Sequence, residues 1–585
     1  MKIKLNENGH FDWKVRKIAV IGPGIVGMPM AALLARARIS IGVSQPAEVV
    51  VVQRNSPNSG WKVGAINAGR SVIGGIEPEL DGIVEEAVKE GLLSATHDYR
   101  QIADADVILV CVQTDKKPDS CEPDYGPLFG ALDSLAAALR EKPAGHVPLV
   151  IIESTLAPST MNTLITDHFA RYGLIEGQDI LLGNSPNRVM PGRLVERISR
   201  SDKLVAGLRA GTPFLIRAIY RHIVTEGALH PTSSLAAEVV KTLENAYRDV
   251  RIAYASEIAR YCNRHDIDFY ALRDQVNQRL AQVDAASRDP NAVPSGGLLI
   301  PTAGVGGHCL PKDGALLCWR RAESGFDTAD SLFLQARLIN EESPAETIRL
   351  AERRFGRLGG KKVAILGTAY RFNSEDTRNA PSLALARQLI EKGCRVTLHD
   401  PFVKPDDQNL LRTRLNRHFT RSLGCAVYDA DYIFLATAHK DYLEGRGGIF
   451  DKALRLKGIV EACNLPVRIE AISRGIAFAG IGRGAKAPGE EFADFVYRGF
   501  RAVEKGVANE VFALTEFLNE RFVPDEFGRV RFRDVRRLAA SCNTGCLIPE
   551  PGPVEEVRPF RGFASRLVAC AVRMYRGQPA APVGK

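Results

Sequence analysis

The chain has 585 residues, of which 45% are hydrophobic and 25% are charged, so it is long enough for roughly three or four ordinary globular domains. Its net charge of +9 is spread over most of this length, which excludes a densely basic nucleic-acid-binding surface and suits small anionic ligands. The first ten residues lack a signal-peptide core, no apolar run reaches transmembrane length, and the eleven cysteines lack disulfide-like spacing. We therefore expect a cytoplasmic protein in a reducing compartment.

A glycine-rich turn follows the first predicted strand. Residues 17–21 are a short apolar run, and the sequence Gly22-Pro23-Gly24-Ile25-Val26-Gly27 separates this run from a helical pattern at residues 28–37. In this context the glycines predict a dinucleotide site. Gly22 makes the tight turn, Gly24 lets the pyrophosphate approach the backbone, and Gly27 lets the helix pack on the strand. A plain strand-to-helix turn is the alternative interpretation.

The end of the second predicted strand bears on the choice of cofactor. Residues 48–52 form the strand, and Gln53 and Arg54 follow where an acidic residue usually binds the adenosine ribose. Gln53 can still bond a ribose hydroxyl, and Arg54 can stack on adenine or contact a 2′-phosphate. One arginine without a second cation beside it would bind a 2′-phosphate only weakly, so we expect NAD rather than NADP.

Two further predicted strands of this region end at threonines. Residues 106–112 lead to Thr114, and residues 149–152 lead to Thr155. Ligands of a parallel sheet bind beyond the carboxyl ends of its strands, so both side chains are expected at the same crevice as the glycine turn. A capping role is the alternative for each.

A second glycine-rich stretch, from Gly304 to Asp313, carries Cys309 with Lys312 and Asp313 close behind it. A nearby lysine can lower the pKa of a thiol, and a carboxylate can accept a proton, so Cys309 is a candidate attacking thiolate. From these ten residues alone a buried, inert cysteine is an equal alternative.

A long helical pattern begins near Ser234 and runs past Tyr261. On it Lys241, Asn245 and Arg248 are spaced by four and three residues, which places them on one face. The face is suited to an anion or an oxyanion, while a solvated polar face is the alternative. The apolar residues around it indicate an interior helix.

A second alternating pattern of strands and helices begins near Lys361 without a complete G-x-G-x-x-G. We predict an α/β fold with two doubly wound Rossmann-like domains joined by a long central helix, plus a C-terminal extension. The expected parts are an NAD-binding domain at 15–215, a central helical region at 230–340, a second α/β domain at 345–487 and an extension of unknown role at 488–585.

Four motifs in this order resemble the UDP-glucose/GDP-mannose dehydrogenase family. They lie at residues 22–27, 244–250, 304–313 and 376–382, and the resemblance runs from about Arg16 to Arg483. The Gly-Gly-His-Cys sequence that ends at Cys309 is similar to the branch that oxidises UDP-N-acetyl-hexosamines, with mannosamine or glucosamine as the amino sugar.

The resemblance implies two NAD-dependent oxidations at C-6 of the sugar, through an aldehyde trapped on Cys309 and a thioester that water cleaves. It implies that Lys241 and Asn245 stabilise the oxyanion, that Asp313 shares in proton transfer and that Thr114 lies beside the reacting carbon. The implied substrate-binding residues are Asn187, Arg188, Lys241, Asn245, Arg248, Gly306, Arg371 and Arg378. The helix of Lys241 would also form a homodimer contact.

Two residues depart from the family pattern. The family loop usually reads Pro-Glu-Arg-Val, with a glutamate that helps proton transfer, whereas this chain has Asn187; Gln53 stands in place of the usual ribose-binding acid. Three alternatives therefore stay open. The first is the same fold acting on UDP-glucose or GDP-mannose. The second is a simpler hydroxyacid dehydrogenase, which Cys309 and the second α/β domain disfavour. The third is a nucleotide-sugar-binding protein that has lost turnover.

The extension is rich in arginine and outside the resemblance. Residues 492–522 and 563–575 have helical patterns, and residues 549–559 are typical of a linker. Cys542, Cys546 and Cys570 do not supply the four ligands of a zinc site, and we expect no metal. Docking on the body of the protein is favoured over membrane contact, and a chain ending near Ala487 is expected to keep its active site.

Overall fold

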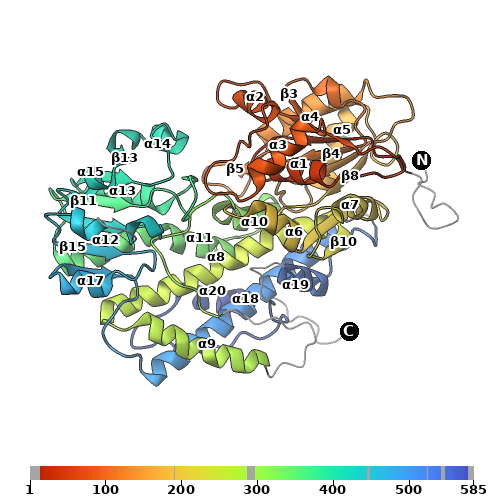
Figure 1. Ribbon diagram of the computed structural model, residues 1–585. Helices are drawn as coiled ribbons and strands as arrows, with labels where there is room; N and C mark the ends of the chain where they lie inside the picture. Colours follow the sequence, from red (N-terminus) through yellow and green to blue (C-terminus); the bar gives the residue numbers. More distant parts are fainter. Residues whose placement is uncertain are drawn as a thin grey trace. The chain divides into compact units, whose positions relative to one another are not determined.

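The computed structural model describes residues 13–189, 191–285, 297–443, 448–523, 525–541 and 547–576. It confirms two parallel α/β sheets, a long central helix and a helical extension (Figure 1). The chain forms two compact units. The first holds the described residues up to Glu244, Ala315–Phe326 and those of Ala513–Gly545, and the second holds those of Asn245–Gly314, Asp327–Phe512 and the part from Cys546 onward.

The sheet of the first unit has eight strands in the order β10-β9-β8-β7-β4-β1-β2-β3. Their bounds are β1 Lys17–Ile21, β2 Glu48–Val52, β3 Leu93–Thr96, β4 Val107–Val110, β7 Leu149–Ile152, β8 Leu181–Asn184, β9 Lys203–Gly207 and β10 Leu229–Ser233. Neighbouring strands are parallel except β8 and β9. The chain moves outward in opposite directions from β1 and β4, so a crevice for a ligand is expected where these two strands end.

Helices cover both faces of this sheet because its strand residues are apolar on both sides. Ile18 and Val20 pack with α1 and α3 on one face, whereas Ala19 and Ile21 pack with α4 on the other. The helices of this unit are α1 Gly27–Arg36, α2 Trp61–Asn67, α3 Leu80–Lys89, α4 Gly126–Leu139, α5 Thr166–Arg171, α6 Leu194–Arg200 and α7 Thr212–Tyr220, with the short turns η1 Tyr99–Ile102 and η2 Met161–Ile165. A small antiparallel ribbon pairs β5 Asp115–Lys116 with β6 Pro123–Asp124.

The sheet of the second unit is entirely parallel, in the order β13-β12-β11-β14-β15-β16. Its strands are β11 Lys362–Leu366, β12 Arg395–His399, β13 Phe419–Thr420, β14 Tyr432–Leu435, β15 Gly458–Glu461 and β16 Ala477–Gly480. Helices α12 Ser343–Phe355 and α13 Pro381–Glu391 pack on one face, and α15 Leu423–Val427, α16 Ile449–Lys452 and α17 Arg468–Ser473 pack on the other. Shorter elements are α14 Gln408–Arg412, η3 Asn416–His418 and η4 Lys440–Tyr442. The second doubly wound domain predicted from the sequence is thus confirmed.

The remaining helices are α8 Ser234–His265, α9 Phe269–Ala285, α10 Leu310–Glu323, α11 Leu332–Glu341, α18 Glu490–Phe522, α19 Phe532–Ala540 and α20 Arg566–Arg576. The extension thus forms the predicted helices, and it docks on the body of the chain. Within the second unit the hydroxyl of Tyr254 on α8 donates to Val496 O on α18 at 2.8 Å, and the hydroxyl of Tyr247 donates to Glu504 at 2.9 Å. On α20, Leu567 and Cys570 are buried.

This docking bears on two expectations. Most side chains from Ala246 to Cys262 of α8 are buried in the chain's own fold, and the homodimer contact through this helix stays a prediction. A chain ending near Ala487 would also expose Tyr247 and Tyr254, so we no longer expect it to fold normally.

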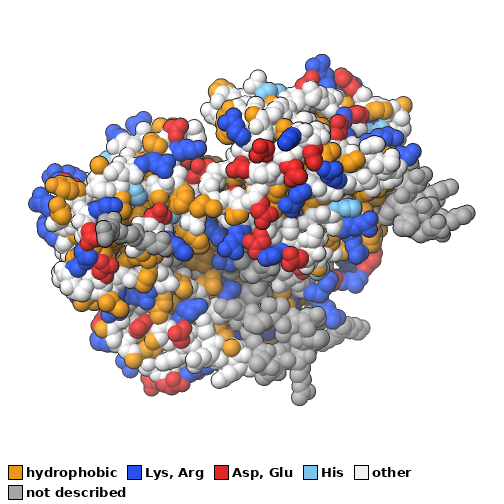
Figure 2. Space-filling view, in the orientation of Figure 1, with side chains coloured by type: hydrophobic (Ala, Val, Ile, Leu, Met, Phe, Trp, Pro, Cys, Tyr) orange, Lys and Arg blue, Asp and Glu red, His pale blue; other side chains and the backbone are white. Residues whose placement is uncertain are grey.

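The segment at residues 547–559 of the extension has no regular secondary structure but is hydrogen-bonded to α18. Residues 547–559 contain no helix or strand, in agreement with the predicted linker, yet Asn509 and Gly552 exchange two hydrogen bonds of 2.9 and 2.7 Å. Cys542 and Cys546 lie outside the described residues. None of the described helices has the length and apolar character needed to cross a membrane. Basic and acidic side chains are interspersed over the face drawn in Figure 2, as a modest net charge predicts.

Candidate active site

The glycine turn of the first unit has the geometry of a dinucleotide site. Gly22 has a φ of +89°, and a Cβ there would lie 2.9 Å from the carbonyl oxygen of Cys111. A Cβ at Gly27 would lie 2.2 Å from Gly22 O, so the start of α1 can approach the turn only without a side chain. At Gly24 a Cβ would meet no described atom within 4 Å, which leaves open space where the pyrophosphate is expected.

Ile25 and Val26 complete the turn, and α1 begins at Gly27, so backbone N–H groups at its N-terminus face the same space. Lys62 on α2 was not found by sequence reasoning. Its Nζ donates to Pro23 O in the turn at 3.3 Å, and burial lowers its pKa. Lys62 thereby adds a cation beside the turn that no short motif could have signalled, because 38 positions separate it from Gly24 in the chain.

The Gln53 side chain at the end of β2 is held by its own loop. The amide nitrogen of Gln53 donates to Ser59 Oγ at 2.9 Å and to Arg54 O at 3.2 Å, which leaves its Oε1 to accept from a hydroxyl group. Arg54 is exposed. Its positive charge acts on Tyr99, whose pKa is nevertheless raised to about 12 by burial.

Thr114 and Thr155 lie together at the ends of β4 and β7, as predicted. The Thr114 hydroxyl donates to the carbonyl oxygen of Thr155 at 2.7 Å, and the Thr114 residue is 3% exposed. This bond joins the two loops that follow these strands. The expected position of Thr114 beside the reacting carbon stays a prediction.

A buried ionic cluster lies beneath the loop of Asn187. Glu153, at the end of β7, accepts hydrogen bonds from Asn187 Nδ2 and Lys203 Nζ, both at 2.8 Å, and from the Tyr220 hydroxyl. Lys203 Nζ also donates to Ser185 O at 3.0 Å, which ties the cluster to the loop.

Burial lowers the pKa of Lys203, the contact with Glu153 opposes this change, and burial raises the pKa of Tyr220 well above its usual value. The Glu153 carboxylate therefore orients the Asn187 amide and neutralises the charge of Lys203.

The guanidinium of Arg188 is held in a polar clamp formed by Glu244, Leu538 and Ser541. Its Nη2 lies 2.6 Å from Glu244 Oε1 and donates to Leu538 O at 3.0 Å, and its Nη1 donates to Ser541 Oγ at 3.0 Å. The Arg188 side chain is 2% exposed. These three residues hold two of the guanidinium nitrogens, and the substrate contact predicted for Arg188 stays a prediction.

In the second unit Cys309 lies at the N-terminus of α10. Its carbonyl oxygen accepts from the backbone N–H groups of Lys312 and Asp313 at 3.1 and 3.0 Å, so it caps the helix. The positive end of a helix dipole stabilises a thiolate. Cys309 is partly exposed, which favours the reactive interpretation over the inert one.

Asp313 links the cysteine helix to α8. Its Oδ2 accepts from Asn245 Nδ2 at 2.6 Å, and its Oδ1 accepts from Lys312 Nζ at 2.7 Å. Both Asp313 and Lys312 are buried, so the lysine neutralises the carboxylate where water cannot. Two of the candidate catalytic residues, Asn245 and Asp313, are thus in direct contact.

The glycines before Cys309 pack against the second α/β domain. Gly307 N donates to Arg378 O at 2.8 Å, and Asn379 Nδ2 donates to Gly307 O at 3.0 Å. A Cβ at Gly306 would lie 2.6 Å from Tyr370 Cβ, so only glycine fits. The cysteine loop and the motif at residues 376–382 are therefore one structural unit, although they lie about 70 residues apart along the chain.

Electrostatics at this contact involve Cys309 directly. Burial raises the pKa of Tyr370 to about 12, with added contributions from Asp376 and Cys309. Burial alone would lower the pKa of Arg378, but its hydrogen bonds to Asp376 raise it overall. Arg371 lies over the ring of Phe372, with 5.4 Å between its Cζ and the ring centroid.

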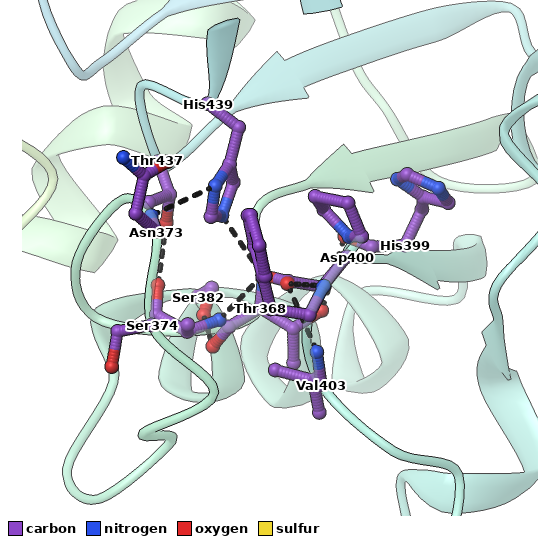
Figure 3. A network of polar contacts seen from close by, with 12 residues as sticks. Thr368, Asn373, Ser374, Ser382, His399, Asp400, Val403, Thr437 and His439 are labelled. Carbon is purple, nitrogen blue, oxygen red and sulfur yellow. Dashed lines mark hydrogen bonds and ion pairs between the residues drawn. The ribbon is translucent and has the colours of Figure 1, made fainter. Parts of the chain in front are cut away.

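A second polar network holds the loops at the carboxyl ends of β11, β12 and β14 (Figure 3). Asp400 is fully buried, accepts from Thr368 N at 2.8 Å and Val403 N at 3.2 Å, and lies 3.2 Å from His439 Nε2. Burial alone would raise the pKa of Asp400, but the contact with His439 and the hydrogen bonds from Ala369 N and Phe402 N lower it. Sequence reasoning did not find this network, because its members come from separate loops.

The predicted residues thus fall into two groups, with Lys241 and the cofactor residues in the first unit and Arg248 and the cysteine loop in the second. Lys241 is 6% exposed, which supports an interior helix rather than a solvated face. A dinucleotide turn on one sheet and a thiol beside a second α/β domain define an oxidoreductase with a dinucleotide cofactor.

Comparison with known proteins identifies the family. The chain matches the models of the UDP-glucose/GDP-mannose dehydrogenase family for the NAD binding domain at residues 16–224, the central domain at 235–342 and the UDP binding domain at 364–465. This chain belongs to the UDP-glucose/GDP-mannose dehydrogenase family and is an NAD-dependent oxidoreductase. The matches leave the extension outside every family model.

Relatives of known name agree with this assignment. The UDP-N-acetyl-D-mannosamine dehydrogenase of Pyrococcus horikoshii is 30% identical over 80% of this chain and 99% of its own length. The structure of UDP-D-ManNAc dehydrogenase from Pyrococcus horikoshii superposes with a TM-score of 0.65 at 29% identity, covering 80% of this chain and 99% of that one. The structure of NDP-N-acetyl-D-galactosaminuronic acid dehydrogenase from Methanosarcina mazei superposes with a TM-score of 0.64 at 31% identity, covering 82% and 97%.

Proposed function

We propose that this chain oxidises the C-6 hydroxyl of a UDP-N-acetyl-hexosamine to the uronate in two NAD-dependent steps. The observation that carries the proposal is the position of Cys309, a partly exposed thiol at a helix N-terminus on a glycine loop that packs against Arg378. The names of the relatives support an N-acetylated amino sugar.

The proposed chemistry uses the cysteine as a covalent anchor. Bound NAD supplies a hydride acceptor for each oxidation. C-6 loses a hydride and its hydroxyl loses a proton, which gives an aldehyde, and the Cys309 thiolate adds to the aldehyde carbon. Loss of a second hydride converts this adduct to a thioester. Water then attacks the thioester carbonyl, the C–S bond breaks, and the uronate and the thiolate are released.

The roles of the other residues follow from the groups they offer. Lys241 and Asn245 donate hydrogen bonds to the developing oxyanion, which is typically worth about a hundredfold or more per donor. Asp313 holds the Asn245 amide at 2.6 Å and shares in proton transfer. Asn187 can orient a hydroxyl or a water molecule but cannot accept a proton near neutral pH.

UDP is proposed to bind in the second unit. Arg378 and Arg371 provide cations near the cysteine loop, and Arg248 on α8 adds a third. Gly306 has no side chain, so the ligand can approach the protein backbone closely there. This assignment accounts for a second doubly wound domain without a complete dinucleotide turn. A homodimer and a cytoplasmic location stay predictions, and light scattering of the purified protein tests the first.

A panel of UDP-sugars tests the proposal, with NAD and NADP offered separately. Reduced cofactor and acid product are measured together, and a ratio of two reduced cofactors per uronate is expected. GDP-mannose and UDP-glucose serve as competing substrates. Turnover of UDP-glucose alone would support the other branch, and binding of UDP-sugars without turnover would show a catalytically impaired homologue.

A further inference from the structure

The C-terminal extension reaches the loop that carries Asn187. Arg188 follows Asn187 in the chain, and its guanidinium donates to the carbonyl of Leu538 and to the hydroxyl of Ser541, both at 3.0 Å. These two residues lie at the C-terminal end of α19, about 350 positions further along the chain. No family model extends to them.

The sequence of α19 explains why it docks in this place. Phe532, Val535, Leu538 and Ala539 recur at helical spacing and are buried, whereas Arg533 and Arg537 are exposed. The helix therefore has one apolar face that must be covered. Within the first unit the segment before it is also anchored, since Asn519 on α18 and Val530 exchange hydrogen bonds of 2.7 and 2.8 Å.

The end of α19 is a suitable receptor for a guanidinium. The Ser541 hydroxyl donates to Leu538 O at 2.7 Å and accepts from Arg188, so the three groups form a closed set of hydrogen bonds. Unpaired carbonyl groups give the C-terminus of a helix partial negative charge, which favours a cation there. Glu244 on α8 supplies a full negative charge, with 2.6 Å between its Oε1 and Arg188 Nη2.

Two members of this clamp, Arg188 and Glu244, are each adjacent in the sequence to a residue of the proposed chemistry. Asn187 precedes Arg188 and bonds to Glu153 at 2.8 Å, and Asn245 follows Glu244 on the same helix. A shift of Arg188 therefore moves Asn187 directly, because only one peptide unit separates their Cα atoms. Small displacements of positioned groups are known to slow catalysis strongly.

We propose that Ser541 and Leu538 of the extension are positioning residues, which hold Arg188 and thereby fix Asn187 for the reaction. The inference rests on the proposed function for its kinetic part. It gives the arginine-rich extension a definite role, namely to complete the support of a loop that the family domains alone leave open on one side. It also places Arg188 in this support rather than against the substrate.

Serine variants of the full-length protein test the proposal. Ser541→Ala removes one partner of Arg188, and Ser541→Thr keeps the hydroxyl. Ser565→Ala is the control, because Ser565 is another serine of the extension that bonds a charged group, Glu257, at 2.8 Å in the second unit. The readouts are kcat, the KM for NAD and for the UDP-sugar, Tm, and hydrogen exchange of a peptide that covers residues 185–189.

For Ser541→Ala we expect kcat to fall about tenfold, as for a misplaced catalytic group, with little change in the KM for NAD. Exchange at residues 185–189 should become faster in this variant alone, and Ser541→Thr should restore both properties. Ser565→Ala should lower Tm by a similar amount without either effect. Equal kcat in Ser541→Ala and Ser565→Ala would overturn the proposal.

The two proposals can fail separately. If the wild-type chain turns over no UDP-sugar, the proposed function fails, and the exchange data then decide about the clamp. Faster exchange at residues 185–189 only in Ser541→Ala would still support it, whereas equal exchange in all variants would overturn it.

Discussion

The side-chain amide of Asn187 donates a hydrogen bond of 2.8 Å to Oε2 of Glu153. Because a carboxylate can only accept, this contact turns the Asn187 nitrogen inward and leaves its carbonyl oxygen for other partners. A carboxyl group therefore lies one hydrogen bond behind the position where the family usually carries its own. Lys203 and Tyr220 hold this carboxylate, so it does not depend on Asn187 for its place.

The first prediction concerns this amide. Asn187 cannot activate the water that cleaves the thioester, so we expect slow turnover and an acyl group retained on Cys309, visible by mass spectrometry of the intact protein. Asn187→Glu should raise the rate of acid release by about a hundredfold, the usual range for positioned acid–base help. Asn187→Gln, which adds length but no carboxyl group, is the control.

A different outcome would assign the activation of this water molecule to Glu153. If the wild-type protein accumulates no adduct, turns over rapidly and gains nothing from Asn187→Glu, then Glu153 replaces the usual family glutamate. In that case Glu153→Gln should slow acid release while the first oxidation continues.

The second prediction concerns the nucleophile. Cys309→Ala should abolish uronate formation and the covalent adduct, because no other group then attacks the aldehyde. Calorimetry should find binding of the UDP-sugar nearly unchanged, since the backbone contacts of Gly307 with Arg378 and Asn379 do not involve the thiol. Uronate formation at the wild-type rate in Cys309→Ala would exclude covalent catalysis.

The third prediction concerns the cofactor. Gln53 has no charge to repel a 2′-phosphate, so the preference for NAD should be weaker than an aspartate would enforce. Gln53→Asp should raise the ratio of kcat/KM for NAD over NADP by about tenfold, which corresponds to about 1.4 kcal/mol of added repulsion. Gln53→Asn, without a charge, should leave the ratio near the wild-type value. A wild-type enzyme that prefers NADP would contradict the assignment.

The fourth prediction concerns the packing of α18 on α8. A Cβ at Gly499 would lie 2.3 Å from the hydroxyl of Tyr254, which is buried and held by Val496 O. Gly499→Ala should therefore destabilise the protein by about 1–3 kcal/mol, the usual cost of overpacking. Gly130→Ala on α4 is the control, because a Cβ there meets no described atom within 4 Å; it should stabilise slightly. Urea unfolding of both variants makes the comparison.

The fifth prediction concerns pH. Burial lowers the pKa of His399 from 6.5 to about 4, next to Tyr442 Oη at 3.3 Å. The unfolded chain takes up a proton at this histidine near pH 6.5, whereas the folded chain does so only near pH 4. The unfolded state therefore binds more protons across this window, and stability falls as the pH falls. In His399→Gln the slope of Tm against pH should be smaller over this range; an unchanged slope would show that other groups cause the loss.

Local sequence alone was enough for the parts of the site that one turn of chain can form. The three glycines from Gly22 to Gly27 have the geometry that their spacing predicted, since a positive φ and a close approach are properties of the backbone itself. The helical repeat in residues 492–522 likewise predicted α18 nearly to its ends.

Only the tertiary structure decided which distant groups meet. The contacts of Glu153 with Asn187 and of Arg188 with Ser541 join residues 34 and 353 positions apart, and no local pattern encodes such pairs. A buried polar group must find a partner wherever the fold provides one, and the partner depends on how strands and helices pack. The sequence therefore predicted a reactive thiol at Cys309. The packing decided which residues hold the loops of the candidate site.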